Sequence, residues 1–238
     1  MKNSFRLLII LLLTQKFTQA QTVYAGNDGA MRFFEMRDDQ GALIKTASEM
    51  GVKGSPMIQD GWAAGTIHFK NGLTFYDTLM NFSLFTNKLY IARNNRYLEL
   101  VQPASSFTLN FRNESGSMDS YLFKNGYPAI EDHDSSFMYE VLYAGENLQL
   151  LSWQHKKVIE TFNYGSPHEK EYAIVQKLYV YLPKEKKMTP LSSYAVQAAK
   201  KSLPDYADNI QAYAASHKLN GKDKTQFVDL LSYLDKNH

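Results

Sequence analysis

The sequence predicts an α+β fold in which an antiparallel β-meander is followed by a short helical segment at the C-terminus. Between residues 65 and 182, short runs of alternating apolar and polar residues are separated by turn signals about every ten residues, which is typical of antiparallel strands. After residue 192 the apolar residues recur at a helical spacing instead. The long crossovers that join parallel strands are missing, which argues against a doubly wound fold. The pattern is compatible with a curved sheet or with a small barrel.

The chain begins with a three-part leader. Two basic residues precede seven consecutive apolar residues at 7–13, and small residues precede a cleavage point between Ala20 and Gln21. This layout predicts a secretory signal peptide over residues 1–20. A membrane-spanning helix needs about 20 apolar residues, and Lys16 interrupts this run early. We therefore expect an exported chain, periplasmic or extracellular, with no transmembrane segment after cleavage.

The segment after the leader, residues 21–62, is expected to be irregular. Turn-forming residues at 26–29 and 38–41 precede a predicted short helix over Ala42–Met50, and Gly54-Ser55-Pro56 then breaks any regular element. A β domain is predicted over residues 63–191, and C-terminal helices that pack on its sheet over residues 192–238.

Residues 63–191 carry the alternation expected of strands joined by hairpins. The expected strands lie near residues 67–69, 73–84, 89–91, 98–100, 107–111, 121–123, 138–143, 148–155 and 172–182. Asn71-Gly72 is the strongest hairpin signal among the turns. Phe107, Leu109 and Phe111 form the clearest run. Because successive side chains of a strand point to opposite faces, we expect these three in the core and the two residues between them outside.

Three short helices are predicted after residue 192. The first spans about Ser192–Lys201, where alanine is frequent. The second begins at a capping box formed by Ser202 and Asp205 and ends near His217, before Asn220-Gly221. In the third, apolar residues recur at helical spacing and predict a stripe that faces the sheet: Phe227, Leu230, Leu231 and Leu234.

A set of short motifs gives the chain a family resemblance. These are Gly54-Ser55-Pro56, Trp62, Gly65-Thr66-Ile67 and a Lys-Asn-Gly hairpin, followed near the end by Lys200-Lys201-Ser202-Leu203 and Lys218-Leu219-Asn220. Over residues 54–238 this order resembles a widespread group of secreted, uncharacterised Bacteroidota proteins. The resemblance implies a β-then-helix architecture and a location in a Gram-negative envelope. It implies no activity and no functional residues.

Composition excludes several kinds of site. The chain has no cysteine, which excludes disulfides, thiolate zinc sites and cysteine nucleophiles. Loss of the leader removes three of the 26 basic residues and leaves 23 against 24 acidic ones, so the mature chain lacks the positive charge of a nucleic-acid-binding protein. Glycine-rich phosphate loops and dinucleotide fingerprints are also missing, and we predict no cofactor.

One polar cluster is a candidate site. Glu131, Asp132, His133 and Asp134 place three carboxyl groups and an imidazole in four consecutive residues. Such groups can hold a hard cation or supply acid–base catalysis. The cluster lacks the ligand spacing of a calcium loop, and it is also typical of a solvated connection between strands.

The aromatic residues provide a second set of candidates. Flat Tyr and Trp rings that are exposed on a sheet can bind sugars or peptides. The candidates for such a ligand-binding face are Trp62, Tyr76, Trp153 and Tyr179. A sheet that is covered on both faces also needs aromatic residues for its core.

Three functional hypotheses follow from these observations. The leading one is a non-enzymatic exported module that binds or scaffolds in the bacterial envelope, with an envelope protein or a glycan as partner. The first alternative is a binder of a small apolar ligand or a glycan in an aromatic-lined cleft. The second is a hydrolase of unrecognised type that uses the Glu131–Asp134 cluster. A pocket that converges on this cluster would favour the enzyme, and an aromatic cleft or a free sheet edge would favour binding.

Overall fold

The structure is a computed structural model that describes residues 23–25, 32–34, 51–93, 96–161, 169–219 and 221–237. The predicted leader and the predicted helix at 42–50 lie outside the described residues. Among the described helices, none combines the length and the apolar character that crossing a membrane requires.

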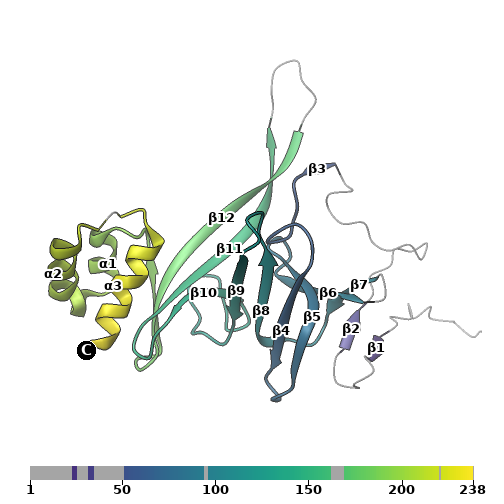
Figure 1. The fold of residues 1–238 in the computed structure, drawn as a ribbon, viewed down its shortest axis with the longest axis horizontal. Helices are drawn as coiled ribbons and strands as arrows, with labels where there is room; N and C mark the ends of the chain where they lie inside the picture. Colours follow the sequence, from purple (N-terminus) through teal and green to yellow (C-terminus); the bar gives the residue numbers. More distant parts are fainter. Residues whose placement is uncertain are drawn as a thin grey trace, which may run out of the picture.

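Thirteen described strands form one sheet (Figure 1). They are β1 (Val23–Ala25), β2 (Arg32–Phe34), β3 (Val52–Lys53), β4 (Ala63–Phe69), β5 (Thr74–Ser83), β6 (Lys88–Arg93), β7 (Arg96–Leu100), β8 (Ala104–Arg112), β9 (Met118–Lys124), β10 (Tyr139–Ala144), β11 (Gln149–Thr161), β12 (Glu169–Leu182) and β13 (Lys187–Leu191). The order is β1-β2-β7-β6-β5-β4-β8-β9-β10-β11-β12-β13, and β3 pairs with β12. All pairs are antiparallel except β3 with β12.

The predicted antiparallel meander is therefore confirmed over residues 65–182. The strand order does not return to its first strand, so the sheet is open and the small-barrel alternative is wrong. Three strands occur inside the segment predicted to be irregular, since β1, β2 and β3 all precede Trp62. The prediction also missed β13, which contains Pro190. Proline lacks the N–H that a central strand donates, but an edge strand tolerates it.

The sheet curls strongly in its first half. Residues 101–103 join β7 to β8, although β6, β5 and β4 lie between them in the sheet. Four flat strand spacings would measure about 19 Å. The chain from Leu100 to Ala104 reaches at most about 14 Å. The sheet must therefore bend so that β7 approaches β8, and this bend encloses the first hydrophobic core.

The first core contains side chains of β4–β9 and of the turn after β5. Phe107, Leu109 and Phe111 are 1%, 0% and 5% exposed, which confirms their predicted orientation. Thr108 and Asn110 lie on the opposite face, where their side chains accept hydrogen bonds from the Thr66 N–H and the Ser120 hydroxyl. The Phe107 and Phe123 rings stack at 5.0 Å.

A glycine permits the close pairing of β4 with β8. A Cβ added at Gly65 would lie 1.8 Å from the Thr108 carbonyl oxygen, a distance that no side chain can occupy. Any larger residue at this position would force the two strands apart.

The helices lie at one end of the sheet (Figure 1), where they contact β13, β10 and β11. They are α1 (Val196–Ser202), a 3₁₀ turn η2 (Pro204–Tyr206), α2 (Ala207–His217) and α3 (Lys224–Lys236). The predicted stripe on α3 is fully buried and forms a second core with Leu148, Leu150, Val180, Leu182 and Leu191. Asp223 caps α3 by accepting hydrogen bonds from the N–H groups of Thr225 and Gln226.

The predicted capping box at the second helix is wrong. Ser202 is the last residue of α1, and its hydroxyl donates to the Pro190 carbonyl on β13 instead. Asp205 lies in the 3₁₀ turn, and α2 begins at Ala207 without a side-chain cap. The Ser202 hydroxyl, on which the predicted capping box depends, is hydrogen-bonded to β13 and therefore does not cap the second helix.

The carboxylate of Asp235 links the helices to the sheet, and this contact is called the clasp. Asp235 at the end of α3 accepts hydrogen bonds from the backbone N–H groups of Glu146, Asn147 and Leu148, at 3.1, 2.6 and 2.8 Å. These three residues form the turn between β10 and β11. A Cβ at Gly145 would lie 2.5 Å from the Asp235 carboxylate, so glycine leaves the space that this contact needs.

Candidate functional site

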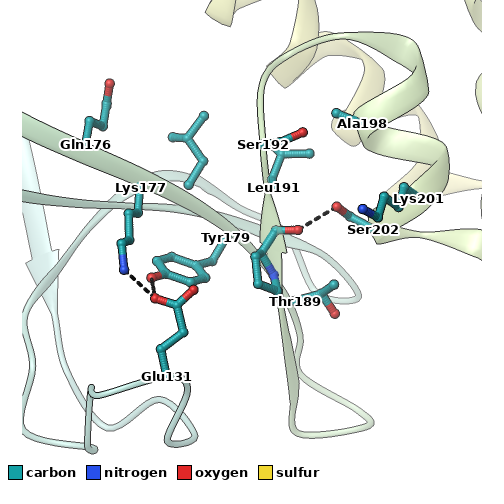
Figure 2. Close-up of a pocket in the computed structure, with 12 residues that line it drawn as sticks. Glu131, Gln176, Lys177, Tyr179, Thr189, Leu191, Ser192, Ala198, Lys201 and Ser202 are labelled. Atoms are coloured by element: carbon teal, nitrogen blue, oxygen red, sulfur yellow. Dashed lines mark hydrogen bonds and ion pairs between the residues drawn. The ribbon is translucent and has the colours of Figure 1, made fainter.

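A cavity of about 600 Å³ lies where the edge of β12, the end of β13 and α1 meet (Figure 2). Its walls are Gln176–Tyr179 of β12, Thr189–Ser192 at the end of β13, and Ala198, Lys201 and Ser202 of α1. Glu131 reaches the cavity from the connection between β9 and β10.

The cavity exists because β13 is much shorter than β12. β13 pairs with β12 only over Leu178–Leu182, and the chain then leaves the sheet towards α1. The Ser202 hydroxyl donates to the Pro190 carbonyl at 2.7 Å and so holds α1 against the outer side of β13. The edge of β12 on the N-terminal side of Leu178 is not paired with β13, and its residues Gln176 and Lys177 line the cavity.

Glu131 and Lys177 form an ion pair at the cavity. The Lys177 ammonium donates to the Glu131 carboxylate at 2.5 Å, and the Tyr179 hydroxyl donates to the same oxygen at 3.2 Å. The hydrogen bond from Lys177 lowers the pKa of Glu131, and the same bond raises the pKa of Lys177. Burial raises the pKa of Tyr179, so its hydroxyl keeps its proton. Glu131 is thus an ionised, paired carboxylate at neutral pH.

His133 belongs to the core rather than to the cavity. The residue is 2% exposed, and its ring lies 4.4 Å from the rings of both Phe137 and Trp153. Nδ1 is hydrogen-bonded to the Tyr139 hydroxyl at 2.8 Å, and Nε2 lies 3.6 Å from the Asp132 carboxylate. Burial lowers the pKa of His133, which favours a neutral imidazole.

The other two acids of the cluster point elsewhere. The Asp132 side chain is 83% exposed, and Asp134 accepts hydrogen bonds from the N–H and the hydroxyl of Ser136. Across the described part of the chain, no three His, Asp or Glu side chains are grouped as metal ligands. The four residues of the cluster are therefore separated by the fold: Glu131 faces the cavity, His133 the core and the others solvent or their own loop.

The aromatic candidates are also separated. Tyr179 is fully buried, so it offers its hydroxyl but no exposed ring face. Trp153 is half-buried and lies under Lys177, whose Nζ is 5.7 Å from the ring centre. Tyr76 is 72% exposed on β5, in the first half of the sheet, and Trp62 is half-buried just before β4. The proposed flat aromatic face is not assembled from these four.

Sequence reasoning did not identify most residues of the cavity. Gln176, Thr189 and Ser192 carry no motif, because each is an ordinary polar residue of a strand or a strand end, and Lys201 belongs to a motif of the family resemblance that implies no functional residue. The interruption of the sheet edge by Pro190 is the one local signal that could have pointed there. Since Glu131 neutralises Lys177, Lys201 leaves the cavity with a net positive charge.

Comparisons with protein-family models, curated proteins and solved structures gave no match to this chain.

Proposed function

We propose that this chain is an exported, non-enzymatic binding protein of the bacterial envelope and that the cavity beside β12 is its ligand site. Export is supported by the three-part leader over residues 1–20. The envelope location is supported by the resemblance to secreted Bacteroidota proteins.

The observation that carries the proposal is the cavity itself. Its volume of about 600 Å³ falls within the range of roughly 300–1,000 Å³ that is usual for ligand sites. Gln176, Thr189 and Ser192 supply both hydrogen-bond donors and acceptors to it. With the net positive charge at Lys201, this lining favours a polar or anionic ligand, such as a peptide or an acidic glycan, over a small apolar molecule.

The hydrolase alternative has less support from the geometry. General acid–base catalysis needs a titratable group that faces the substrate. Glu131 is held ionised by its ion pair with Lys177, and His133 lines the core instead of the cavity. The two groups cannot act together on a ligand in the cavity.

Ligand titration followed by NMR tests the binding site. The ¹⁵N-labelled protein is titrated with a panel of short peptides and with a panel of neutral and acidic disaccharides. We expect shifts at Thr189, Ser192 and Lys201 with one of the panels. Ser192→Trp, which adds a large side chain to the cavity lining, should abolish them, whereas Ser120→Trp on strand β9, outside the lining, should not. Shifts confined to other surfaces, or none, would reject this cavity as the ligand site.

Export is tested separately by mass spectrometry of the mature chain. We expect an N-terminus at or near Gln21 in the secreted or periplasmic fraction. A soluble cytoplasmic chain that retains residues 1–20 would overturn this part of the proposal.

A further inference from the structure

We propose that the ligand is an extended peptide segment that carries an acidic side chain, and that it binds by adding a strand to β12 along Ala173–Lys177. This inference rests on the proposed function, because the added strand would end in the cavity described above. It specifies the class of ligand and the way in which it is held.

The outer edge of β12 is interrupted. β13 pairs with this edge over Leu178–Leu182, and β3 pairs with it at Lys170 and Glu171. No described strand pairs with the edge between these two segments. An exposed edge invites pairing, and proteins usually cover or charge it. Here Ile174, in the middle of the gap, is 57% exposed.

The phase of the β11–β12 ladder shows which backbone groups face the gap. Lys156 lies opposite Ile174, and its N–H donates to the Leu84 carbonyl at 3.0 Å, away from β12. Opposed residues of an antiparallel pair either bond to each other or both turn away. The N–H and C=O of Ile174 therefore point to the outer edge, and so do those of Gln176 two residues further on.

The pairing with β13 gives the same phase. Pro190 lies opposite Tyr179 and has no N–H, and its carbonyl accepts from the Ser202 hydroxyl on the far side. Pro190 and Tyr179 are thus a non-hydrogen-bonded pair, and Leu178 is the β12 residue that bonds to β13 here. Gln176 and Ile174 continue this series, so an added strand would find two N–H groups and two carbonyls in register.

The length of the gap limits what can enter it. β3 and β13 occupy the same row of the sheet at its two ends, which leaves room for about five residues, or roughly 17 Å. β12 of a second copy has 14 residues and would collide with both neighbours. A short extended segment whose ends turn away from the sheet fits, whereas edge-to-edge pairing of two copies through β12 does not.

Charge indicates the chemistry of the segment. A strand antiparallel to β12 places its first residue opposite Lys177, at the cavity that Lys201 also lines. Glu131 already pairs with Lys177, so Lys201 is the cation available to a further carboxylate. An acidic side chain at this first position is the complementary group, and small or β-branched residues suit the positions opposite Gln176, Val175 and Ile174.

The probe is the capped pentapeptide Ac-Glu-Thr-Val-Val-Thr-NH₂, whose binding is measured by calorimetry or NMR. N-methylation of its second or fourth residue removes an N–H that faces β12 and should weaken binding about fivefold or more. N-methylation of the third residue, whose N–H faces away, is the matched control. Replacement of the peptide's Glu by Gln should also weaken binding. Equal loss at all three methylation sites, or equal affinity of the Glu and Gln peptides, would overturn the proposal.

Hydrogen exchange provides an independent readout. The amides of Ile174 and Gln176 should exchange fast in the free protein and slow on addition of the peptide, whereas Val175, which faces β11, should be protected throughout. Slow exchange of Ile174 and Gln176 in the free protein would show that the edge is already covered and would overturn the proposal.

Variants of the chain separate this inference from the proposed function. Gln176→Pro removes an outward N–H that an edge strand can lose without unfolding, and it should abolish peptide binding. Lys201→Glu should remove the preference for the Glu peptide, while Lys200→Glu, the same change on a residue outside the cavity lining, should not. Ligand shifts at Lys201 without protection of Ile174 and Gln176 would leave the cavity as a binding site and reject strand addition. No ligand shifts at all would reject both.

Discussion

The two main hydrophobic cores of this protein are built in different ways. The first is made by strands β4–β9 and is rich in phenylalanine, and all its buried members lie between Ala63 and Phe123. The second joins β10–β13 to the helices and pairs Leu148 and Leu150 with residues as distant as Leu230 and Leu234. The first core follows from alternation along neighbouring strands. The second exists only if the C-terminal helices dock, which the Asp235 contacts to the β10–β11 turn promote.

A third, tyrosine-rich cluster lies on the opposite face of β11 and β12 from the second core, because Leu151 and Tyr179 alternate with Leu150 and Val180 along these strands. It consists of Tyr127, Tyr139, Leu151 and Tyr179, with His133 packed against it. Hydroxyl groups in this cluster bring hydrogen-bonding atoms close to the cavity, as the contact from Tyr179 to Glu131 shows. The candidate site therefore lies between members of the tyrosine-rich cluster and of the second core, since Tyr179 lines it together with Leu191 and Ala198.

The largest expected effect is the loss of a fully buried leucine from either core. Leu109 and Leu230 are both 0% exposed. Leu109→Ala and Leu230→Ala should each lower the free energy of unfolding by about 2–5 kcal/mol, because each leaves a cavity. Chemical denaturation followed by circular dichroism and by tryptophan fluorescence measures this loss.

Leu79→Ala on the exposed face of β5 is the control and should cost less than about 0.5 kcal/mol. If the two cores unfold as one unit, both leucine variants shift both signals together. If Leu230→Ala shifts only the helical signal, the helical segment unfolds independently of the sheet.

A smaller effect is expected from the clasp between α3 and the sheet. Asp235→Ala leaves three backbone N–H groups of the β10–β11 turn without their acceptor and should cost about 1–3 kcal/mol. Asp229→Ala, on the exposed face of the same helix, should change stability little. Equal midpoints for the two variants would mean that the second core docks without this contact.

The tyrosine-rich cluster should make stability depend on pH. The folded chain keeps His133 neutral because burial lowers its pKa, whereas in the unfolded chain it takes up a proton near pH 6.5. Stability from this residue is therefore complete above pH 6.5 and is lost as the pH falls towards the folded-state pKa. Asp132 and Glu131 oppose the lowering of this pKa, and Lys177 adds to it.

The measurement is the unfolding free energy of the natural chain and of His133→Gln between pH 7.5 and pH 5.5, roughly one unit to either side of the His value. The natural chain should lose more stability than the variant on acidification. Burial raises the pKa of Glu140, which acts in the opposite direction, but this contribution is common to both proteins and cancels in the comparison. Parallel pH profiles would show that His133 does not titrate on unfolding.

The smallest effect is expected at the ion pair of the cavity. The side chains of Lys177 and Glu131 are 41% and 38% exposed, so water screens their attraction. Lys177→Gln should change the free energy of unfolding by about 0–1 kcal/mol. A loss of unfolding free energy above 2 kcal/mol is about the cost of disrupting a core. Such a loss would contradict the view that this ion pair contributes little to the stability of the fold.

The sequence alone was sufficient for the succession of an antiparallel sheet and helices and for the faces of single strands and helices, although it missed β1–β3 and β13. The alternation at Phe107, Leu109 and Phe111 and the stripe on α3 both predicted burial correctly, because the direction of a side chain depends on the local backbone period. Local reasoning failed where a distant partner competed. The Ser202 hydroxyl donates to the Pro190 carbonyl instead of capping a helix. The prediction missed the edge strand β13, which contains Pro190.

From the sequence, only single residues of the candidate site could be selected, and not their arrangement around one cavity. Glu131 was selected as part of an acidic cluster and Tyr179 as an aromatic platform, yet they lie 48 residues apart and meet through a hydrogen bond at one cavity. Their meeting depends on the register of β12 against β11, on where β13 stops and on the path of the loop from β9 to β10. Periodicity determines which way a side chain points from its own element. Only the curl of the sheet and the docking of the helices decide what it faces, because those depend on contacts between residues far apart in the chain.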